Sequence, residues 1–221
     1  TRDLTGTSGV REKDAVWSPD GTTIAYFSDA DGEYNLYTID AEGAGAPQKL
    51  TGFESGHRHT LRWSPDGKRI AFTDHTLTLS FIDVASKKLT KVDKADYQNV
   101  DISLDLKDIY DFSWSPDSRF IAYAKTGESL VDEIYIYSLE TNQSRCVSDG
   151  EFNDFHPVFS KDGEHLIFVS NRRFDPTFCD FEWEMVYKKL AGLYSYTLRK
   201  DGPALFPILP ATEEAKYSAK A

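Results

Sequence analysis

Three short stretches of the chain concentrate the side chains best suited to contacting a ligand. His57-Arg58-His59 is an i, i+2 histidine pair of the kind that can bind a transition metal, but no third or fourth ligand accompanies it. We therefore predict neither a metal nor a cofactor. Lys13-Asp14 and His156-Pro157 hold the corresponding places in a repeat described below. Because loops carry function more often than strands, the candidate ligand-binding residues are Arg11, Lys13, His57, Arg58, Arg62 and His156.

The remaining reactive side chains fit structural roles better than catalytic ones. The segment 29–33, Asp-Ala-Asp-Gly-Glu, begins like a calcium loop, but its twelfth position is Asp40 instead of the glutamate of an EF-hand. We expect a hairpin turn there. No Gly-x-Ser-x-Gly occurs. Cys146 and Cys179 form no CxxC pair. We expect two half-buried thiols, and a single disulfide between them is the alternative. We predict no catalytic residue in this chain.

Composition narrows the set of partners. The 221 residues include 25 Lys and Arg against 36 Asp and Glu, a net charge of −11. Nucleic acid and anionic membranes both attract basic surfaces, so neither is expected as a partner. No apolar run approaches the ~18 residues of a membrane span. Residues 1–20 contain no signal peptide. The sequence is therefore compatible with a mature form and with a cut piece of a longer chain. It is also compatible with the cytoplasm and with the periplasm of a prokaryote.

A repeated motif provides the elements that position these side chains. Trp-Ser-Pro-Asp-Gly at residues 17–21 recurs at 63–67, then as Trp-Ser-Pro-Asp-Ser at 114–118 and Phe-Ser-Lys-Asp-Gly at 159–163. Neighbouring copies are 45 to 51 residues apart, a period typical of a propeller blade. Each copy is followed by an Ile-Ala-Tyr-like stretch, an alternating aromatic and β-branched stretch, and a polar Leu-Thr-like stretch. Each unit therefore supplies four short strands.

The Ser-Pro-Asp-Gly core of the motif is predicted to be architecture, although it contains a serine and an acid. Proline presets φ in a type I turn, aspartate bonds nearby backbone amides, and glycine takes the positive φ that closes the hairpin. The tryptophan fills the gap between neighbouring sheets. Ser118 and Lys161 depart from the pattern and should weaken their turns.

These units predict an all-β fold, a β-propeller of four-stranded antiparallel blades with about four blades present. The blade units span about 8–51, 57–92, 109–148 and 154–206, and residues 211–221 form a tail or linker. The tryptophan strand is expected innermost and the lysine-bearing Leu-Thr strand at the outer edge. Residues 1–5 match an outer strand of an earlier blade. A fragment of a larger propeller and a small four-bladed ring are both open.

Residues 174–189 break the period between the second and third strands of unit four. Phe178, Phe181 and Met185 have the spacing of a short helical turn, with Trp183 on another face. Two interpretations remain open: a loop packed on the rim of the propeller, and a docking element for a neighbouring domain, since its aromatic residues exceed what a solvated loop needs.

The motif series resembles the propeller repeats shared by the translocation protein TolB, prolyl-oligopeptidase-type propellers and tricorn proteases. Over residues 1–210 the chain is similar to the second, seven-bladed propeller of tricorn-like proteases. Residues 8–17 and 28–37 resemble parts of its blades, and the irregular segment 170–202 also looks like the tricorn type.

The resemblance implies a non-catalytic β-propeller module of a tricorn-like serine protease that gates or guides peptides and packs on catalytic domains absent from this chain. In that family the catalytic serine and histidine lie in domains that follow the propeller, so no catalytic residue is transferred. The implied partners are peptides and the protease domains of a parent serine peptidase; homo-oligomerisation stays open. The alternative is an independent TolB-like protein-binding scaffold. A third hypothesis is a lyase or hydrolase on a propeller.

Overall fold

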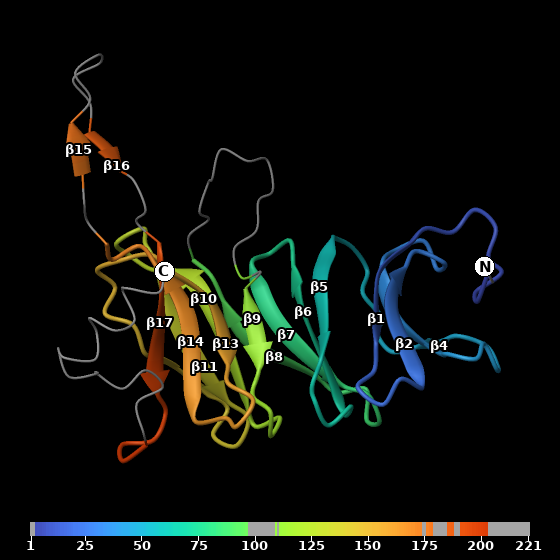
Figure 1. Cartoon of the computed structure of the whole chain (residues 1–221). Helices are drawn as coiled ribbons and strands as arrows, with labels where there is room; N and C mark the ends of the chain where they lie inside the picture. The colour runs from blue at the N-terminus through green and yellow to red at the C-terminus, as the bar shows by residue number, and fades with distance from the viewer. Residues whose placement is uncertain are drawn as a thin grey trace, which may run out of the picture.

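The computed structural model describes residues 3–96, 109, 111–173, 176–178, 185–187 and 191–202 (Figure 1). In these ranges the chain forms antiparallel sheets that stand side by side, and no residue is helical. The predicted fold class, all-β with propeller-type antiparallel blades, is confirmed. The same residues include no helix that is long and apolar enough to cross a membrane.

Four sheets correspond to the four repeats, and we number them as blades 1 to 4. Blade 1 contains β1 (Glu12–Trp17), β2 (Thr23–Ser28), β3 (Asn35–Asp40) and β4 (Gln48–Lys49). Blade 2 contains β5 (Arg58–Trp63), β6 (Arg69–Asp74), β7 (Thr78–Asp83) and β8 (Leu89–Lys94). Blade 3 contains β9 (Phe112–Trp114), β10 (Phe120–Thr126), β11 (Asp132–Ser138) and β12 (Gln143–Cys146). The described strands of blade 4 are β13 (Asp154–Phe159), β14 (His165–Ser170) and β17 (Gly192–Thr197). Each sheet follows the chain order.

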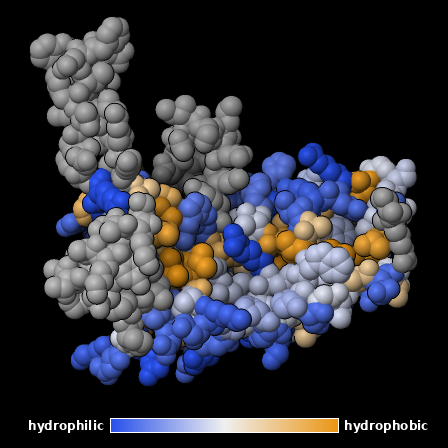
Figure 2. Space-filling model, viewed as in Figure 1, coloured by the Kyte–Doolittle hydropathy of each residue, from blue (hydrophilic) through white to orange (hydrophobic). Residues whose placement is uncertain are grey.

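The core lies in the gaps between blades. Successive strand residues point to opposite faces, so each central strand contributes apolar side chains to both of its neighbours. Between blades 1 and 2, Phe27 and Leu36 meet Ile70 and Phe72. Separate clusters fill the gaps between blades 2 and 3 and between blades 3 and 4. Figure 2 shows apolar residues mostly in a band across the middle of the viewed face, with hydrophilic residues along both edges.

The Ser-Pro-Asp-Gly turns make the same hydrogen bonds in all four blades. Ser18 Oγ donates to Asp20 Oδ1 at 2.6 Å and accepts from the backbone N–H of Thr23 at 2.9 Å. The same two bonds recur at the serines of blades 2, 3 and 4. Gly21 closes its turn with φ of 73°, and Ser118 adopts φ of 60° at the corresponding place. The motif is architecture, as predicted.

The motif tryptophans tie each blade to the one before it. Trp63 Nε1 donates to the carbonyl oxygen of Val16 at 3.3 Å, and Trp114 Nε1 donates to that of Arg62 at 3.2 Å. Each acceptor directly precedes the tryptophan of the earlier blade. Trp17 has no earlier blade within the described residues, and it is 60% exposed.

The N-terminal segment differs from the outer strand predicted over residues 1–5. Its described part forms bends, because Asp3 Oδ1 accepts from the backbone N–H groups of Thr5 at 3.2 Å and Gly6 at 3.0 Å. Short polar side chains of this kind compete with strand pairing for backbone donors. The tail at 211–221 lies outside the described residues, and the limits of the blade units stay predictions.

The helical turn expected within residues 174–189 is not present in the parts of that segment that the structure describes. The described parts are two strands, β15 (Pro176–Phe178) and β16 (Met185–Tyr187), which pair antiparallel. The apolar spacing suits a helix face, but β-branched Thr177 and Val186 at the strand centres favour extended backbone. Pairing also satisfies backbone groups that a single helical turn leaves open.

Candidate functional site

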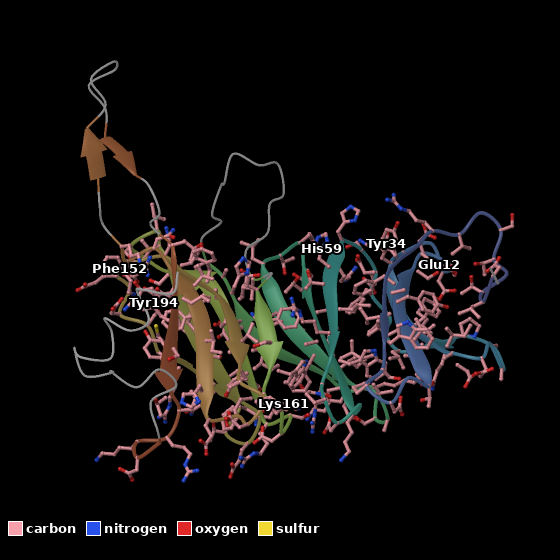
Figure 3. The ribbon with its side chains drawn as sticks, viewed as in Figure 1. Glu12, Tyr34, His59, Phe152, Lys161 and Tyr194 are labelled. Atoms are coloured by element: carbon pink, nitrogen blue, oxygen red, sulfur yellow. The ribbon has the colours of Figure 1, made fainter. Side chains whose placement is uncertain are left out.

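Four of the six candidate residues gather at one end of the junction between blades 1 and 2. In Figure 3, Glu12, Tyr34 and His59 lie along one edge of the row of blades, and Lys161 lies along the opposite edge. We call the first edge the rim and the second the turn edge, because the Ser-Pro-Asp-Gly turns are there.

Lys13 bridges blades 1 and 2 at the rim. Its Nζ donates to the carbonyl oxygen of Arg58 at 2.9 Å and lies 4.7 Å from the centre of the Tyr34 ring. Burial lowers the pKa of the Lys13 amine, and the carboxylate of Asp14, 3.9 Å away, opposes that shift. A half-buried cation over an aromatic face is held by the ring quadrupole as well as by its hydrogen bond. Lys13 therefore fixes the position of Tyr34.

Arg58 lies inside the junction instead of pointing into solvent. Its guanidinium carbon is 3.9 Å from the centre of the Phe53 ring, and one terminal nitrogen donates to the carbonyl oxygen of Gly56. The residue is only 6% exposed, and burial lowers its pKa. Arg58 thus holds the loop before β5 in place. Its positive charge acts on the rim residues from inside the junction.

A cleft of about 330 Å³ opens at this end of the junction and is lined by Asp29, Gly32, Glu33, Tyr34, Gly56 and His57. The His57 ring is 6.1 Å from the Tyr34 ring and 6.5 Å from the His59 ring. Arg11 borders this rim cleft through its backbone N–H, which donates to Asp29 Oδ1 at 2.7 Å. The walls of the rim cleft are thus polar, with two carboxylates, an imidazole and a phenol ring.

The other two candidates, His156 and Arg62, both attract a third residue, Asp111. His156 Nδ1 lies 2.6 Å from Asp111 Oδ2. Burial raises the pKa of the Asp111 carboxyl, and attraction to His156 and Arg62 opposes this shift. Ionisable side chains from blades 2, 3 and 4 therefore act on one another near the inner strands.

Asp111 is not among the candidates predicted from the sequence, although its position in the repeat could have indicated it. It stands three residues before Trp114, the place that Asp14, Thr60 and His156 hold in the other units. In β1, β5 and β13 the strand register shifts around that place, and the three residues there have φ between 54° and 56°. A bulge of this kind re-aims side chains at the edge of a sheet.

Two other kinds of reactive group lie in the described residues, the four turn serines and Cys146. The four turn serines are held between an aspartate and a backbone N–H. Cys146 is exposed, not half-buried as predicted, and local burial of its sulfur raises the thiol pKa, which disfavours the thiolate. Cys179 lies outside the described ranges. Within those ranges, no group of three His, Cys, Asp or Glu side chains could hold a metal ion.

The known proteins that resemble this chain agree with the repeat and the sheet order described above. Residues 1–220 match the family model described as the tricorn protease second beta propeller domain. Tricorn protease homolog 1 of Streptomyces coelicolor is 25% identical over 210 residues, which cover 93% of this chain and 19% of that protein.

Two solved structures show the same fold. The crystal structure of the tricorn protease superposes with a TM-score of 0.76 at 21% identity, covering 96% of this chain and 21% of that chain. TolB from Acinetobacter baumannii superposes with a TM-score of 0.51 at 18% identity, covering 72% of this chain and 37% of that chain. The chain thus spans about a fifth of the length of its tricorn relatives.

Proposed function

Because this chain belongs to the family of tricorn protease second β-propeller domains, we propose that it is a non-catalytic propeller module that guides peptides toward the protease domains of a longer parent protein. The observation that carries the proposal is the rim cleft, where a polar groove of about 330 Å³ stands at the junction of two blades. Peptide passage needs a polar surface that binds reversibly and performs no chemistry.

The residues of the rim cleft support weak peptide binding. Asp29 and Glu33 offer acceptors for peptide N–H groups and cationic side chains, and Tyr34 offers an aromatic face with a polar tip. The Lys13 amine lies over the Tyr34 ring, and the Arg58 guanidinium lies over the Phe53 ring. These contacts support the walls of the cleft from inside the junction. Since the cleft is open and its anchors are few, its affinity is low, as suits a path that substrates must leave.

The two ends of the row support a module that continues into further blades. Trp17 at the blade 1 end is 60% exposed, whereas the equivalent Trp114 is 8% exposed. Leu193 at the blade 4 end is 71% exposed. Trp63 and Trp114 contact the preceding blade from the same motif position, so the exposed Trp17 marks a surface that a further blade would cover. We therefore assign both ends to contacts with other parts of the parent.

Peptide guidance can be tested in the parent protein. Tyr34→Ala combined with His57→Ala should raise KM for a long fluorogenic peptide severalfold and leave kcat unchanged, because the cleft acts before the chemical step. Lys161→Ala, at the opposite edge, serves as the matched control. Unchanged KM in the double variant would remove the guiding role.

The parent itself is tested by its reading frame. We expect sequence for protease domains several hundred residues beyond Ala221. A stop codon soon after Ala221 would instead favour the independent TolB-like scaffold, and pull-downs with the folded chain would then identify its partner.

A further inference from the structure

A groove of about 470 Å³ lies at the turn edge between blades 3 and 4, far from the rim cleft. Phe120, Ile136, Phe159 and Leu198 provide its apolar lining. Equivalent positions in the repeat explain why a groove forms at this junction. The volume and the charges of the groove indicate the kind of ligand that it binds.

The groove arises from two smaller side chains at equivalent positions. Between blades 2 and 3, Trp114 packs edge-on against Phe81, with ring centres 6.0 Å apart. Phe159 replaces that tryptophan at the next junction. Ile136 replaces the phenylalanine, since Phe81 pairs across its sheet with Ala71 as Ile136 pairs with Ala122. Both members of the contact are therefore reduced in volume.

The backbone does not close the space that these replacements leave. A β-carbon placed on Gly67 would lie 3.9 Å from Pro19 Cδ, and one placed on Gly163 would lie 3.9 Å from Pro116 Cδ. The glycine of one turn and the proline of the preceding turn thus have the same spacing at these two junctions. The groove beside Phe159 and Ile136 shows that the lost volume has not been filled at this junction, since collapse around lost core volume is only partial.

The border of the groove is charged. Arg119 Nε lies 2.7 Å from Asp117 Oδ2, and an Arg199 terminal nitrogen lies 3.0 Å from Glu164 Oε1. Asp162 adds a third carboxylate, whose pKa is held low by the hydroxyl of Ser160. Three carboxylates against two guanidinium groups leave the border net negative.

We propose that this groove binds one aromatic side chain, followed by a basic residue, from an extended segment of a partner polypeptide. The aromatic ring fills the volume that an indole and a phenylalanine occupy at the preceding junction. The basic residue meets the excess carboxylate at the border. The site is separate from the rim cleft and does not depend on the guiding role.

A labelled peptide tests the proposal with the 221-residue chain. We expect saturable binding of fluorescein-Ser-Gly-Trp-Arg-Ser-amide by fluorescence anisotropy, and a loss of at least about tenfold when Trp is replaced by Ala or Arg by Glu. Phe159→Trp should fill the groove from within and weaken binding by a similar factor. This variant restores the residue of the repeat, and its folding is checked by thermal unfolding.

Two leucines of blade 4 form a matched pair of controls. Leu198→Ala removes part of the groove lining and should weaken binding, whereas Leu193→Ala, also exposed but outside the groove, should leave it unchanged. Equal binding by wild type and Phe159→Trp would overturn the proposal. If sedimentation shows a wild-type dimer that Phe159→Trp dissociates, the occupant is a second copy, and the peptide proposal is also overturned.

Discussion

Four serines in the turns show how residue chemistry is used in this chain. Each hydroxyl donates to an aspartate two residues later and accepts from a backbone N–H five residues later. A hydroxyl held in this way is a poor nucleophile, because it has no nearby base that could take its proton at neutral pH. The same bonds hold the aspartates ionised, which makes the turns sensitive to acid.

Acid should weaken the turns of blades 1 and 4. The Ser18 and Ser160 hydroxyls lower the pKa of Asp20 and Asp162 below the ordinary value of 3.8. A lowered folded-state pKa gives stability that is fully present above about pH 4 and is lost as pH falls through the folded-state value. The Tm difference between wild type and the double variant Asp20→Asn, Asp162→Asn should therefore shrink between about pH 4 and pH 2. A difference that stays constant over this range would contradict the linkage.

The blade 4 turn should gain stability from the residue that its repeat lacks. The other three turns carry proline where blade 4 has Lys161, and all four make the same hydrogen bonds. Lys161→Pro should raise the free energy of unfolding by about 0.4–1 kcal/mol, because the ring restricts the unfolded chain. Urea unfolding measures it, with Lys161→Ala as the control for loss of the lysine side chain. Destabilisation by proline would show that the backbone of this turn differs from that of the other three turns.

At the scale of elements, the inner strands and their tryptophans set the spacing between blades. The indoles of Trp63 and Trp114 each fill a gap between blades and donate to a backbone carbonyl of the earlier blade. The bulges in β1, β5 and β13 turn the residue three positions before the motif away from the regular ladder. This arrangement brings His156 to Asp111 across a blade junction.

Two tryptophans of the same motif should respond unequally to the same substitution. Trp114→Phe replaces a buried indole with a smaller phenyl ring and removes its hydrogen bond to the carbonyl oxygen of Arg62, which should cost about 2 kcal/mol. Trp17→Phe changes an exposed side chain and should stay within about 0.5 kcal/mol. Chemical denaturation of both variants measures the difference. Equal losses would mean that Trp17 is covered in solution.

At the scale of the whole molecule, the row of blades has two unlike ends. Blade 1 presents Trp17, and blade 4 presents Leu193 and Val158, which is 53% exposed. Surfaces of this kind promote association when nothing covers them.

Leu193→Glu should reduce association of the isolated chain. The variant places a charge at the blade 4 end without touching a buried contact, so Tm should change little. Sedimentation velocity over a range of concentrations measures the effect, and Leu130→Glu, at another exposed leucine, is the control. Association that is equal in both variants would place the contact elsewhere.

The sequence by itself determined the number of blades, the order of the described strands within each blade and the structural role of the turns. These features depend on local rules of period, turn chemistry and strand alternation, which act over a few residues. It was misleading where local rules compete, as at Asp3, whose side chain binds backbone donors, and in β15 and β16.

Only the tertiary structure decided which candidates form a site. Lys13 and Arg58 are 45 residues apart in the chain, and they meet because neighbouring blades stack. The stacking adds Tyr34 to the rim cleft and joins Asp111 to His156. It also leaves the groove beside Phe159 open. Such contacts depend on the sizes of side chains in two repeats at once, so no rule confined to one repeat could have predicted them.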